Sequence, residues 1–366
     1  MSPVITIKDV AREAGCGIAT VSRVLNKSGA ASAETRERVL DAATRLGFSF
    51  NELGRSLQSQ RTRTIGCLVP SLVNPVFAEA VQDLQKEALG AGFQVLLACS
   101  NYDPALEADA LRMLLAKRVD GIVLTLSSSA GNPALEHLRG QGLPLCMLYN
   151  SPVEGVPSAY VDNRRAAAQV AAEFARLGHR RVAFLALRFG ASDRSHERYE
   201  GFRDGCLAAG LEAPELIEVD EAIRFEDVKL AQRLKGPGAL TGVFASNDYL
   251  ALSVIGALHD LGLSVPGDVS VVGFDGIDMG LAIRPRLATV VTDAREMGRS
   301  AAQTLIGMID AQGAATDQPQ NSQKSPQKTP SPELPGMAFS FRRAESLGPA
   351  RGGGTDDGQA ATSPPS

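Results

Sequence analysis

The chain has 366 residues, of which 44% are hydrophobic and 21% are charged, and its formal net charge is −4. This length suffices for two or three domains with sizeable cores, and the composition is ordinary for a globular protein. No apolar run reaches the roughly 18 residues that a membrane helix needs. Charged residues from Lys8 to Glu13 interrupt the apolar core that a signal peptide requires. We therefore expect a cytoplasmic protein with no membrane partner.

Cysteine and histidine spacing argues against several kinds of site. The five cysteines, at positions 16, 67, 99, 146 and 206, form no CxxC pair, and the four histidines are equally dispersed. This spacing predicts reduced thiols, without a disulfide framework and without a bound metal.

Charge is distributed unevenly along the chain. Residues 1–64 hold ten Lys or Arg and six Asp or Glu, whereas the remainder holds 27 and 35. A basic head on an acidic body favours nucleic-acid contact that is confined to the head.

The segment from Thr6 to Asn26 has the pattern of two short helices joined by a tight turn. The Thr6 hydroxyl can accept a bond from an unpaired backbone N–H at the start of the first helix. The apolar stripe of that helix consists of Ile7, Val10, Ala11 and Ala14. The second helix buries Val21, Val24 and Leu25 and leaves polar Thr20, Ser22, Arg23 and Asn26 on its other side. This is the layout of a helix-turn-helix, whose second helix lies in the DNA major groove. The alternative is an ordinary helical hairpin in a core.

A third helix is predicted between Ser32, a capping residue, and Gly47, a stop signal. Its inward-facing residues are expected to be Val39, Leu40, Ala43 and Leu46. The polar stretch 49–64 that follows is either a flexible linker or a hinge that folds only on DNA. In the second case Leu57 is an apolar wedge for the minor groove, with Arg55, Arg61 and Arg63 near phosphates.

From Ile65 onward the pattern changes to alternating strands and helices. The expected strands are 65–69, 93–99, 121–126, 143–148, 181–187, 241–246, 269–274 and 336–341. Such alternation predicts parallel sheets with right-handed crossovers. These strands are too many for one sheet, so we expect two similar lobes. A ligand would bind beyond the carboxyl ends of the strands, in the cleft between the lobes.

The order of these parts resembles the LacI/GalR family of bacterial transcriptional regulators. The matching blocks are DVAREAG…TVSRVLN, GRSLQSQRTRTIG, NPVFAEAV, KRVDGIVL, LGHRRVAFL, RYEGF, ASNDYLALS, VPGDVSVVGFDG and PRLATVV. The resemblance implies an N-terminal all-α helix-turn-helix headpiece and an α/β effector domain with two lobes, similar to periplasmic binding proteins. It also implies a homodimer or tetramer that binds a near-palindromic double-stranded operator.

On this basis the chain divides into a helix-turn-helix domain (1–48), a hinge (49–64) and an effector domain (65–345). Lobe 1 should take about 65–161 and 292–312, and lobe 2 about 162–291 and 334–343. Residues 313–333, rich in Pro, Ser and Gln, should be a disordered insert, and 346–366 a disordered tail.

Family positions in the head and hinge imply a set of DNA contacts. The predicted DNA-binding residues are Thr6, Ile18, Ala19, Thr20, Ser22, Arg23, Asn26, Asn51, Arg55 and Leu57. Ile18, Ala19 and Arg23 match base-reading positions, and an arginine can grip guanine with two hydrogen bonds. Three departures from the family pattern, at Cys16-Gly17, Phe50 and Gly54, weaken the case for a capped second helix and a well-formed hinge helix.

The resemblance also implies an effector pocket. Its predicted residues are Asn74, Phe77, Tyr149, Arg198, Asn247 and Asp275. Polyols need paired donors and acceptors together with an apolar face, and this set supplies both. The alternatives are that Arg198 forms a surface salt bridge with Glu197 or Glu200, and that Asp275 is only a turn residue.

The expected function is sequence-specific transcriptional regulation, of the repressor type, of a carbohydrate-utilisation operon. The effector is expected to be a sugar or a sugar acid such as gluconate, because two blocks, PSLVNPVFAEA and GFDGIDMGLAIRPRLATVVTDAREMG, look closest to gluconate-utilisation repressors. Arg198 suits a carboxylate, whereas Asp275 does not.

Two rival functions are an enzyme on a Rossmann-like fold and a periplasmic sugar-binding protein. No GxGxxG follows the strand 65–69, and no catalytic Ser/His/Asp or Cys/His arrangement is recognisable from spacing. We therefore expect no enzymatic activity and no cofactor. The lack of a signal peptide and the presence of the head both oppose the second rival.

Overall fold

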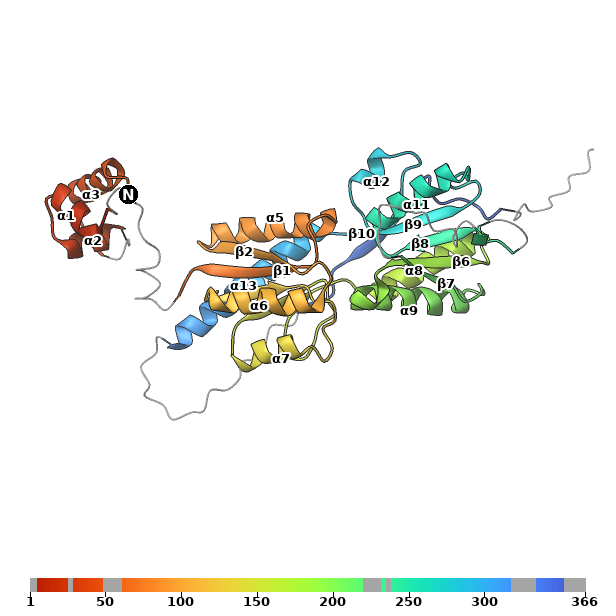
Figure 1. Cartoon of the computed structure of the whole chain (residues 1–366), viewed down its shortest axis with the longest axis horizontal. Coiled ribbons are helices and arrows are strands. Elements are labelled where there is room, and N and C mark those ends of the chain that lie inside the picture. The colour runs from red at the N-terminus through yellow and green to blue at the C-terminus, as the bar shows by residue number, and fades with distance from the viewer. Residues whose placement is uncertain are drawn as a thin grey trace, which may run out of the picture. The chain divides into compact units, whose positions relative to one another are not determined.

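The computed structural model describes residues 5–25, 29–48, 61–219, 232–234, 238–316 and 334–351. They belong to two compact units, Met1–Thr62 and Arg63–Ser366 (Figure 1). Asn26, Asn51, Arg55 and Leu57, and with them the predicted hinge up to residue 60, lie outside the described residues.

The described part of the first unit contains three helices, α1 (Ile7–Glu13), α2 (Ile18–Leu25) and α3 (Ala33–Arg45). Their core is small and built from valine and alanine side chains, with Val10, Val21, Val24 and Val39 at its centre. A core of this size gives little stability, so the helix ends matter for this unit.

Both predicted capping residues, Thr6 and Ser32, stand at helix starts. Ser32 accepts a hydrogen bond from the Thr35 N–H at the start of α3. Thr6 and Asp9 form a reciprocal capping box at the start of α1. The Asp9 carboxylate accepts the Thr6 N–H at 2.9 Å and also the Thr6 hydroxyl at 2.6 Å. Asp9 thereby satisfies a donor at the end of α1 that carries partial positive charge.

The prediction for the inward face of α3 is wrong at Leu40, which is 48% exposed. Ala42 is fully buried instead, between Val39 and Ala43. Positions 39, 42, 43 and 46 fall at i, i+3, i+4 and i+7, and Leu40 lies beside that stripe.

The second unit contains two sheets. The first has the order β2-β1-β3-β4-β5 with all neighbours parallel. Its strands are β1 (Thr64–Val69), β2 (Gln94–Cys99), β3 (Gly121–Leu124), β4 (Leu145–Leu148) and β5 (Ser158–Ala159). The second has the order β11-β10-β9-β8-β6-β7, in which only the β10–β11 pair is antiparallel. Its strands are β6 (Val182–Leu187), β7 (Glu215–Val219), β8 (Gly242–Ala245), β9 (Ser270–Asp275), β10 (Ala288–Thr292) and β11 (Phe339–Arg342). The predicted pair of parallel sheets is confirmed, but β5, β7 and β10 were not among the expected strands.

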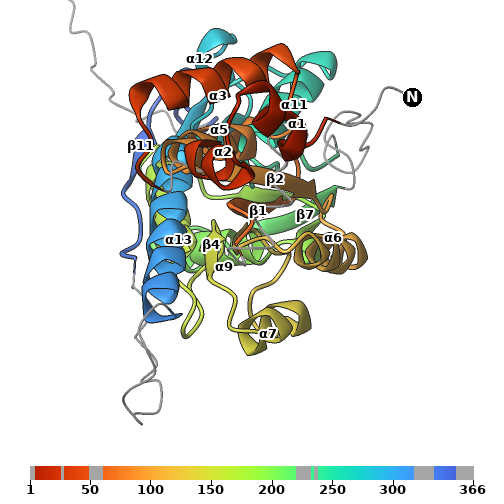
Figure 2. The ribbon, with the colours of Figure 1, turned by 90° about the vertical axis from the view of Figure 1, so that its left-hand side faces the viewer.

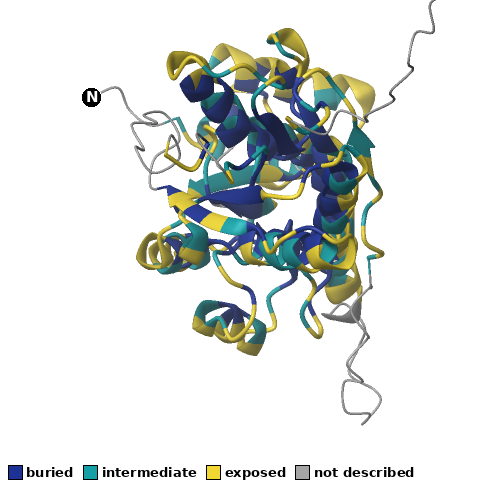
Figure 3. Ribbon diagram, turned by 90° about the vertical axis from the view of Figure 1, so that its right-hand side faces the viewer, coloured by how far each residue is buried: buried dark blue, intermediate teal, exposed yellow. Residues whose placement is uncertain are grey.

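Helices cover the sheets, and their outward faces are exposed while central strands such as β3, β4, β8 and β9 are buried (Figure 3). The helices are α5 (Pro75–Gly90), α6 (Pro104–Ala116), α7 (Pro133–Gly140), α8 (Asn163–Arg176), α9 (Asp193–Ala208), α11 (Asp248–Asp260), α12 (Met279–Ala282) and α13 (Ala294–Thr316). A short 3-10 helix, η1 (Phe189–Ala191), precedes α9. Helices α5, α6 and α7 all begin with an Asn or Asp cap followed by proline, a sequence that starts a helix without losing a needed N–H.

We call the first sheet with α5, α6, α7 and α13 lobe 1, and the second sheet with α8, α9, α11 and α12 lobe 2. Helix α13 follows β10 of the second sheet, yet it packs against α5 and runs beside β4 of the first (Figure 2). The chain also passes between the sheets after β5, and Val161 there forms a parallel bridge with Met337.

Each lobe contains a helix pair in direct backbone contact. A Cβ on Gly201 of α9 would lie 2.2 Å from the Arg164 carbonyl oxygen of α8. A Cβ on Gly298 of α13 would lie 2.0 Å from the Ala80 carbonyl oxygen of α5. Only glycine permits either approach, so both pairs are fixed by packing.

Two segments are more ordered than the sequence predicted. Helix α13 continues to Thr316, four residues into the expected insert, and residues 317–333 lie outside the described part of the chain. In the expected tail, Ser346 is fully buried; its hydroxyl donates to the Val271 carbonyl at 2.6 Å and accepts the Ala288 N–H at 2.8 Å. The chain therefore remains part of lobe 2 beyond residue 345.

Among the described residues, no helix combines the length and apolarity that crossing a membrane requires. Within the same ranges, no group of three or more His, Cys, Asp or Glu side chains could hold a metal ion.

Candidate functional site

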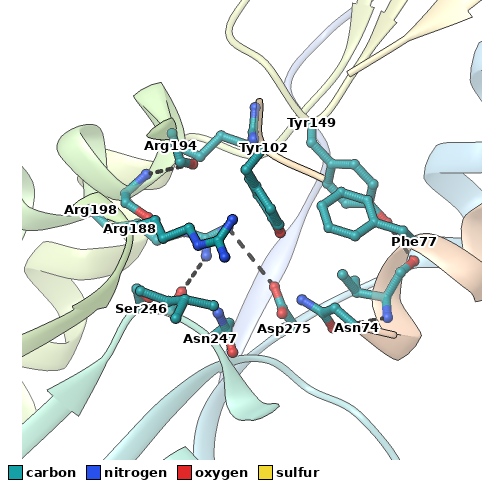
Figure 4. Close-up of a pocket in the computed structure, with 14 residues that line it drawn as sticks. Asn74, Phe77, Tyr102, Tyr149, Arg188, Arg194, Arg198, Ser246, Asn247 and Asp275 are labelled. Carbon is teal, nitrogen blue, oxygen red and sulfur yellow. Dashed lines mark hydrogen bonds and ion pairs between the residues drawn. The ribbon is translucent and has the colours of Figure 1, made fainter. Parts of the chain in front are cut away.

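A pocket lies between the two lobes, where the carboxyl ends of strands from both sheets meet (Figure 4). The pocket is open to solvent. Its lining residues are Asn74, Val76, Phe77, Tyr102, Tyr149, Leu187, Arg188, Ser192, Arg194, Ser195, Arg198, Ser246, Asn247 and Asp275. The structure thus brings together all six residues that the sequence suggested for an effector.

The backbone around this pocket is strained. Tyr102, Tyr149, Arg188 and Asp275 line it with φ angles of 60°, 72°, 44° and 119°, in the region that favours glycine. Such conformations persist only where surrounding structure enforces them, and they concentrate at ligand sites. The pocket is therefore a preformed feature of the fold.

Arg198, on α9, is buried and held by protein groups. Its Nε donates to Asn163 Oδ1 at 2.8 Å, and its Nη1 donates to the Ser246 carbonyl at 2.5 Å. The guanidinium carbon lies 3.6 Å from the centre of the Phe274 ring, and Nη2 lies 3.9 Å from Asp275 Oδ1. Burial lowers the pKa of Arg198 and the Asp275 carboxylate opposes that shift.

The surface alternative for Arg198 is therefore wrong. Glu200 pairs with Arg164, and Glu197 accepts a hydrogen bond from Asn163. Arg198 points instead toward the pocket and Asp275 (Figure 4).

Asp275 ends β9 and supplies the carboxylate of the pocket. Burial raises its pKa to about 6, while Arg198, Asn74 and Arg194 oppose that shift. Its Oδ2 is buried and has no hydrogen-bond partner in the structure. A carboxylate so enclosed is more than a turn residue.

A second buried carboxyl, Asp248 at the start of α11, positions Asp275. Its Oδ2 accepts the N–H groups of Gly276 and Ile277 at 2.7 and 2.8 Å, directly after Asp275. Its Oδ1 accepts the Thr289 hydroxyl at 2.5 Å. Burial and the charge of Asp275 raise the pKa of Asp248 to about 8.

Lobe 1 contributes an aromatic wall to the pocket. The Tyr149 hydroxyl donates to the Val76 carbonyl at 2.8 Å, and the ring meets Phe77 edge-on at 5.1 Å. Asn74 caps α5 by accepting the Val76 N–H, and on the opposite lobe Asn247 caps α11 by accepting the Leu250 N–H. An apolar face opposite charged groups is the arrangement that sugar-like ligands need.

Several lining residues were missed from the sequence, among them Tyr102, Arg188, Arg194 and Ser246. Arg194 lies four residues before Arg198 on the same helix, so helical spacing could have identified it. Arg188 and Ser246 directly follow β6 and β8, and Tyr102 lies three residues after the end of β2, all at strand ends where ligands of parallel sheets bind.

The first turn of α9 also joins the lobes. The Asp193 carboxylate accepts the Ser129 N–H at 3.0 Å and the Asn150 side-chain amide at 2.9 Å. Arg194 Nη1 donates to the Leu126 carbonyl at 2.7 Å. All three partners belong to lobe 1, so the pocket is closed at this edge by polar contacts.

In the first unit, the predicted DNA-reading residues lie on α2. Ile18 is 45% exposed, Ala19 and Arg23 are exposed, and Thr20 and Ser22 are half-buried. Arg23 Nε donates to the Ala19 carbonyl at 3.3 Å, so its guanidinium lies along the helix. Thr6 is exposed at the start of α1. An exposed apolar and cationic face on a small helical unit fits base edges and phosphates.

Comparison with known proteins identifies both units. The family described as bacterial regulatory proteins, lacI family, matches residues 6–51, and the periplasmic binding protein-like domain matches residues 171–328. The chain is 32% identical over 297 residues to the HTH-type transcriptional regulator DegA of Bacillus subtilis, covering 80% of this chain and 88% of DegA. It is 32% identical over 306 residues to the HTH-type transcriptional regulator GntR of Escherichia coli K12, covering 83% of this chain and 91% of GntR.

Among solved structures, a lac repressor dimer bound to operator and the anti-inducer ONPF has the same fold, with a TM-score of 0.80 at 23% identity over 94% of this chain and 99% of that one. The helical first unit, the pocket between the lobes and these relatives all indicate the same family. The chain therefore belongs to the LacI family of bacterial regulatory proteins and is a DNA-binding transcriptional regulator.

Proposed function

We propose that the protein represses a carbohydrate-utilisation operon in the cytoplasm, and that a small sugar or sugar acid bound between lobes 1 and 2 controls its operator affinity. The observation that supports this most directly is the pocket itself. It combines a buried arginine and a buried carboxylate with the ring wall of Phe77 and Tyr149. Gluconate is one candidate, because the blocks PSLVNPVFAEA and GFDGIDMGLAIRPRLATVVTDAREMG resemble gluconate-utilisation repressors.

The switch works through the relative position of the lobes. An effector that binds one lobe arrangement more tightly shifts the population toward it. In a homodimer on a near-palindromic operator, such a shift changes the spacing of the two headpieces. The coupling between effector and operator should be worth about 1–3 kcal/mol.

The pocket binds its effector without turning it over. Among the described residues that line it there is no histidine, cysteine or lysine, and its one carboxylate faces an arginine. A nucleophile next to a base, which hydrolytic catalysis requires, is missing from that set.

Selection of DNA sequences by the full chain tests the proposal. The enriched sequences should be near-palindromic, and one of the tested sugars or sugar acids should change the affinity for them at least severalfold. Enrichment without two half-sites would contradict the dimer. A chain lacking residues 1–62 should bind the same effector and no operator; retained sequence-specific binding would contradict the role of the headpiece.

A further inference from the structure

The two lobes are joined in two different ways. The chain itself crosses between them after β5 and after β10. Asp193, in the first turn of α9, joins them through its side chain instead. This turn follows β6, which β9 and β8 separate from β10 in the order of the second sheet. The side-chain connection therefore lies away from the β10 crossing, where a change in the angle between the lobes moves atoms further.

The Asp193 carboxylate is surrounded by donors of lobe 1. Ser129 donates both its N–H and its hydroxyl to Oδ2, at 3.0 and 3.2 Å. The side-chain amide of Asn150 donates to both carboxylate oxygens, at 3.0 and 2.9 Å. The Asp193 N–H adds a bond in the other direction, to the Ser127 carbonyl at 2.9 Å. Hydrogen bonds to a charged acceptor are about twice as strong as neutral ones, so this one residue contributes much of the contact.

The lobe 1 side of this contact is held in place before Asp193 reaches it. We call Ser127, Ser129 and Asn150 the socket. Asn150 is fully buried; its Oδ1 accepts the Leu126 N–H at 2.9 Å and its amide also donates to the Leu126 carbonyl at 3.0 Å. Glu107 on α6 is buried as well and accepts the Ser127 N–H at 2.8 Å. A socket fixed in this way loses little conformational freedom when the contact forms.

We propose that Asp193 is a latch that holds lobes 1 and 2 in their present arrangement, and that it sets the operator affinity which the effector then changes. This rests on the proposed function, in which the position of the lobes controls operator affinity. The bonds of the latch join protein groups directly, so they act before an effector binds. An effector shifts the lobes with or against the latch, and the size of the response depends on this side chain.

Exchanging the acid and the amide across the contact tests the latch in the full chain. Asp193→Asn places two amides opposite each other, and Asn150→Asp places two carboxylates opposite each other. Either single variant should therefore open the latch. The double variant again places a carboxylate opposite an amide and should close it. Asp204→Asn, at an exposed pair with Arg203 on the same helix, is the matched control.

Hydrogen exchange measures the latch itself and needs no effector. In each single variant the N–H groups of residues 127–132 should exchange about 10-fold faster or more, the value of one charge-assisted hydrogen bond. The double variant should reverse most of that change, and the control should show none. Unchanged exchange in the single variants would overturn the latch and leave the effector response of the proposed function intact. Exchange that rises equally in the buried strands would mean general unfolding and would overturn it too.

Affinity for the selected operator tests the link from the latch to DNA binding. Without effector, both single variants should change this affinity in the same direction, by about 5-fold or more, and the double variant should restore it. An open latch with unchanged operator affinity would overturn this inference together with the switch in the proposed function. A change that the double variant fails to restore would trace the effect to another contact and would overturn the latch alone.

Discussion

The headpiece and the effector unit place their functional side chains in opposite surroundings. On α2 the side chains predicted to face DNA, including Ile18 and Arg23, are exposed above a core of valine and alanine. Around the pocket, Arg194, Arg198 and Asp275 are buried and, apart from two atoms, held by protein groups. Operator DNA is large and brings its own acceptors to an exposed helix, whereas a small effector must be enclosed.

In the headpiece, a side chain that binds can therefore be changed without a large loss of stability. In the effector unit, the same kind of change should alter both ligand binding and stability. An exposed side chain can be removed with little effect on folding. Removing one partner of a buried charged pair leaves the other unpaired in low dielectric, which is strongly destabilising. The following substitutions and pH changes test that contrast.

Arg198→Met should have the largest effect. It should destabilise the effector unit by about 3–5 kcal/mol, because Asp275 loses its cation and Asn163 and Ser246 lose their donor. Urea unfolding measures this. Arg203→Met, at an exposed pair on the same helix, is the matched control and should cost less than about 1 kcal/mol. Similar losses in both variants would contradict the coupling of pocket and stability.

Arg23→Ala should affect recognition without affecting folding. Discrimination at one base pair of each half-site should fall by about 1–3 kcal/mol, with an unchanged melting temperature. Competition binding with single-base operator variants measures it. A uniform loss across all sequences would instead identify Arg23 as a phosphate contact. Arg45→Ala, which removes only the exposed pair with Glu13, is the control.

The two units should respond to pH in opposite directions. Burial raises the pKa of Asp275 to about 6 and of Asp248 to about 8, so the folded effector unit holds these protons more tightly than the unfolded chain. The stability that protonated Asp275 and Asp248 give to the effector unit is present below about pH 4 and is lost as pH rises through 6 and 8. Bonds from Thr6 lower the pKa of Asp9, so the headpiece loses stability as pH falls below about 4.

Asp248→Asn removes one of these titrations while keeping an acceptor oxygen. Between pH 6 and 8 the decline in effector-unit stability should flatten by up to about 1.4 kcal/mol per pH unit. Denaturant unfolding across that range measures the slope. An unchanged slope would mean that Asp248 is ionised throughout.

Ser32→Ala should have the smallest effect, about 1 kcal/mol, and only on the headpiece. It removes the oxygen that accepts the Thr35 N–H at the start of α3. Thermal unfolding followed by circular dichroism should show the headpiece transition moving while the effector-unit transition stays. Movement of both transitions would show that the units unfold together.

Sequence patterns predicted the fully buried strands β3 and β4 and missed the edge strands β5 and β7. The segments of β3 and β4 are continuous apolar runs, and all their residues are buried. In β7, at the edge of its sheet, Glu215 and Glu218 are not buried, so the segment does not stand out as a strand. The short β5 has only two residues. Strands β5 and β7 are thus too short or too polar to show a local apolar pattern, whereas β10 was missed although its first three residues are buried.

The sequence allowed prediction of those pocket residues that can be recognised one position at a time. Arg198 and Asp275 followed from the family resemblance, and Arg194 could have been found from helical spacing. The role of Asp248 could not, because it depends on the N–H groups of Gly276 and Ile277, 28 and 29 residues further along the chain. Burial of Ser346 likewise depends on Val271 and Ala288.

The backbone contact at Gly201 has a consequence for altering this protein. It fixes the middle of α9 to α8, while Arg194 and Ser195 in the first turn line the pocket. Ligand chemistry and helix anchoring thus occupy different turns of one helix. Substitutions at positions 194 and 195 are expected to change ligand preference while the anchor stays intact, which makes this turn a starting point for engineering a biosensor.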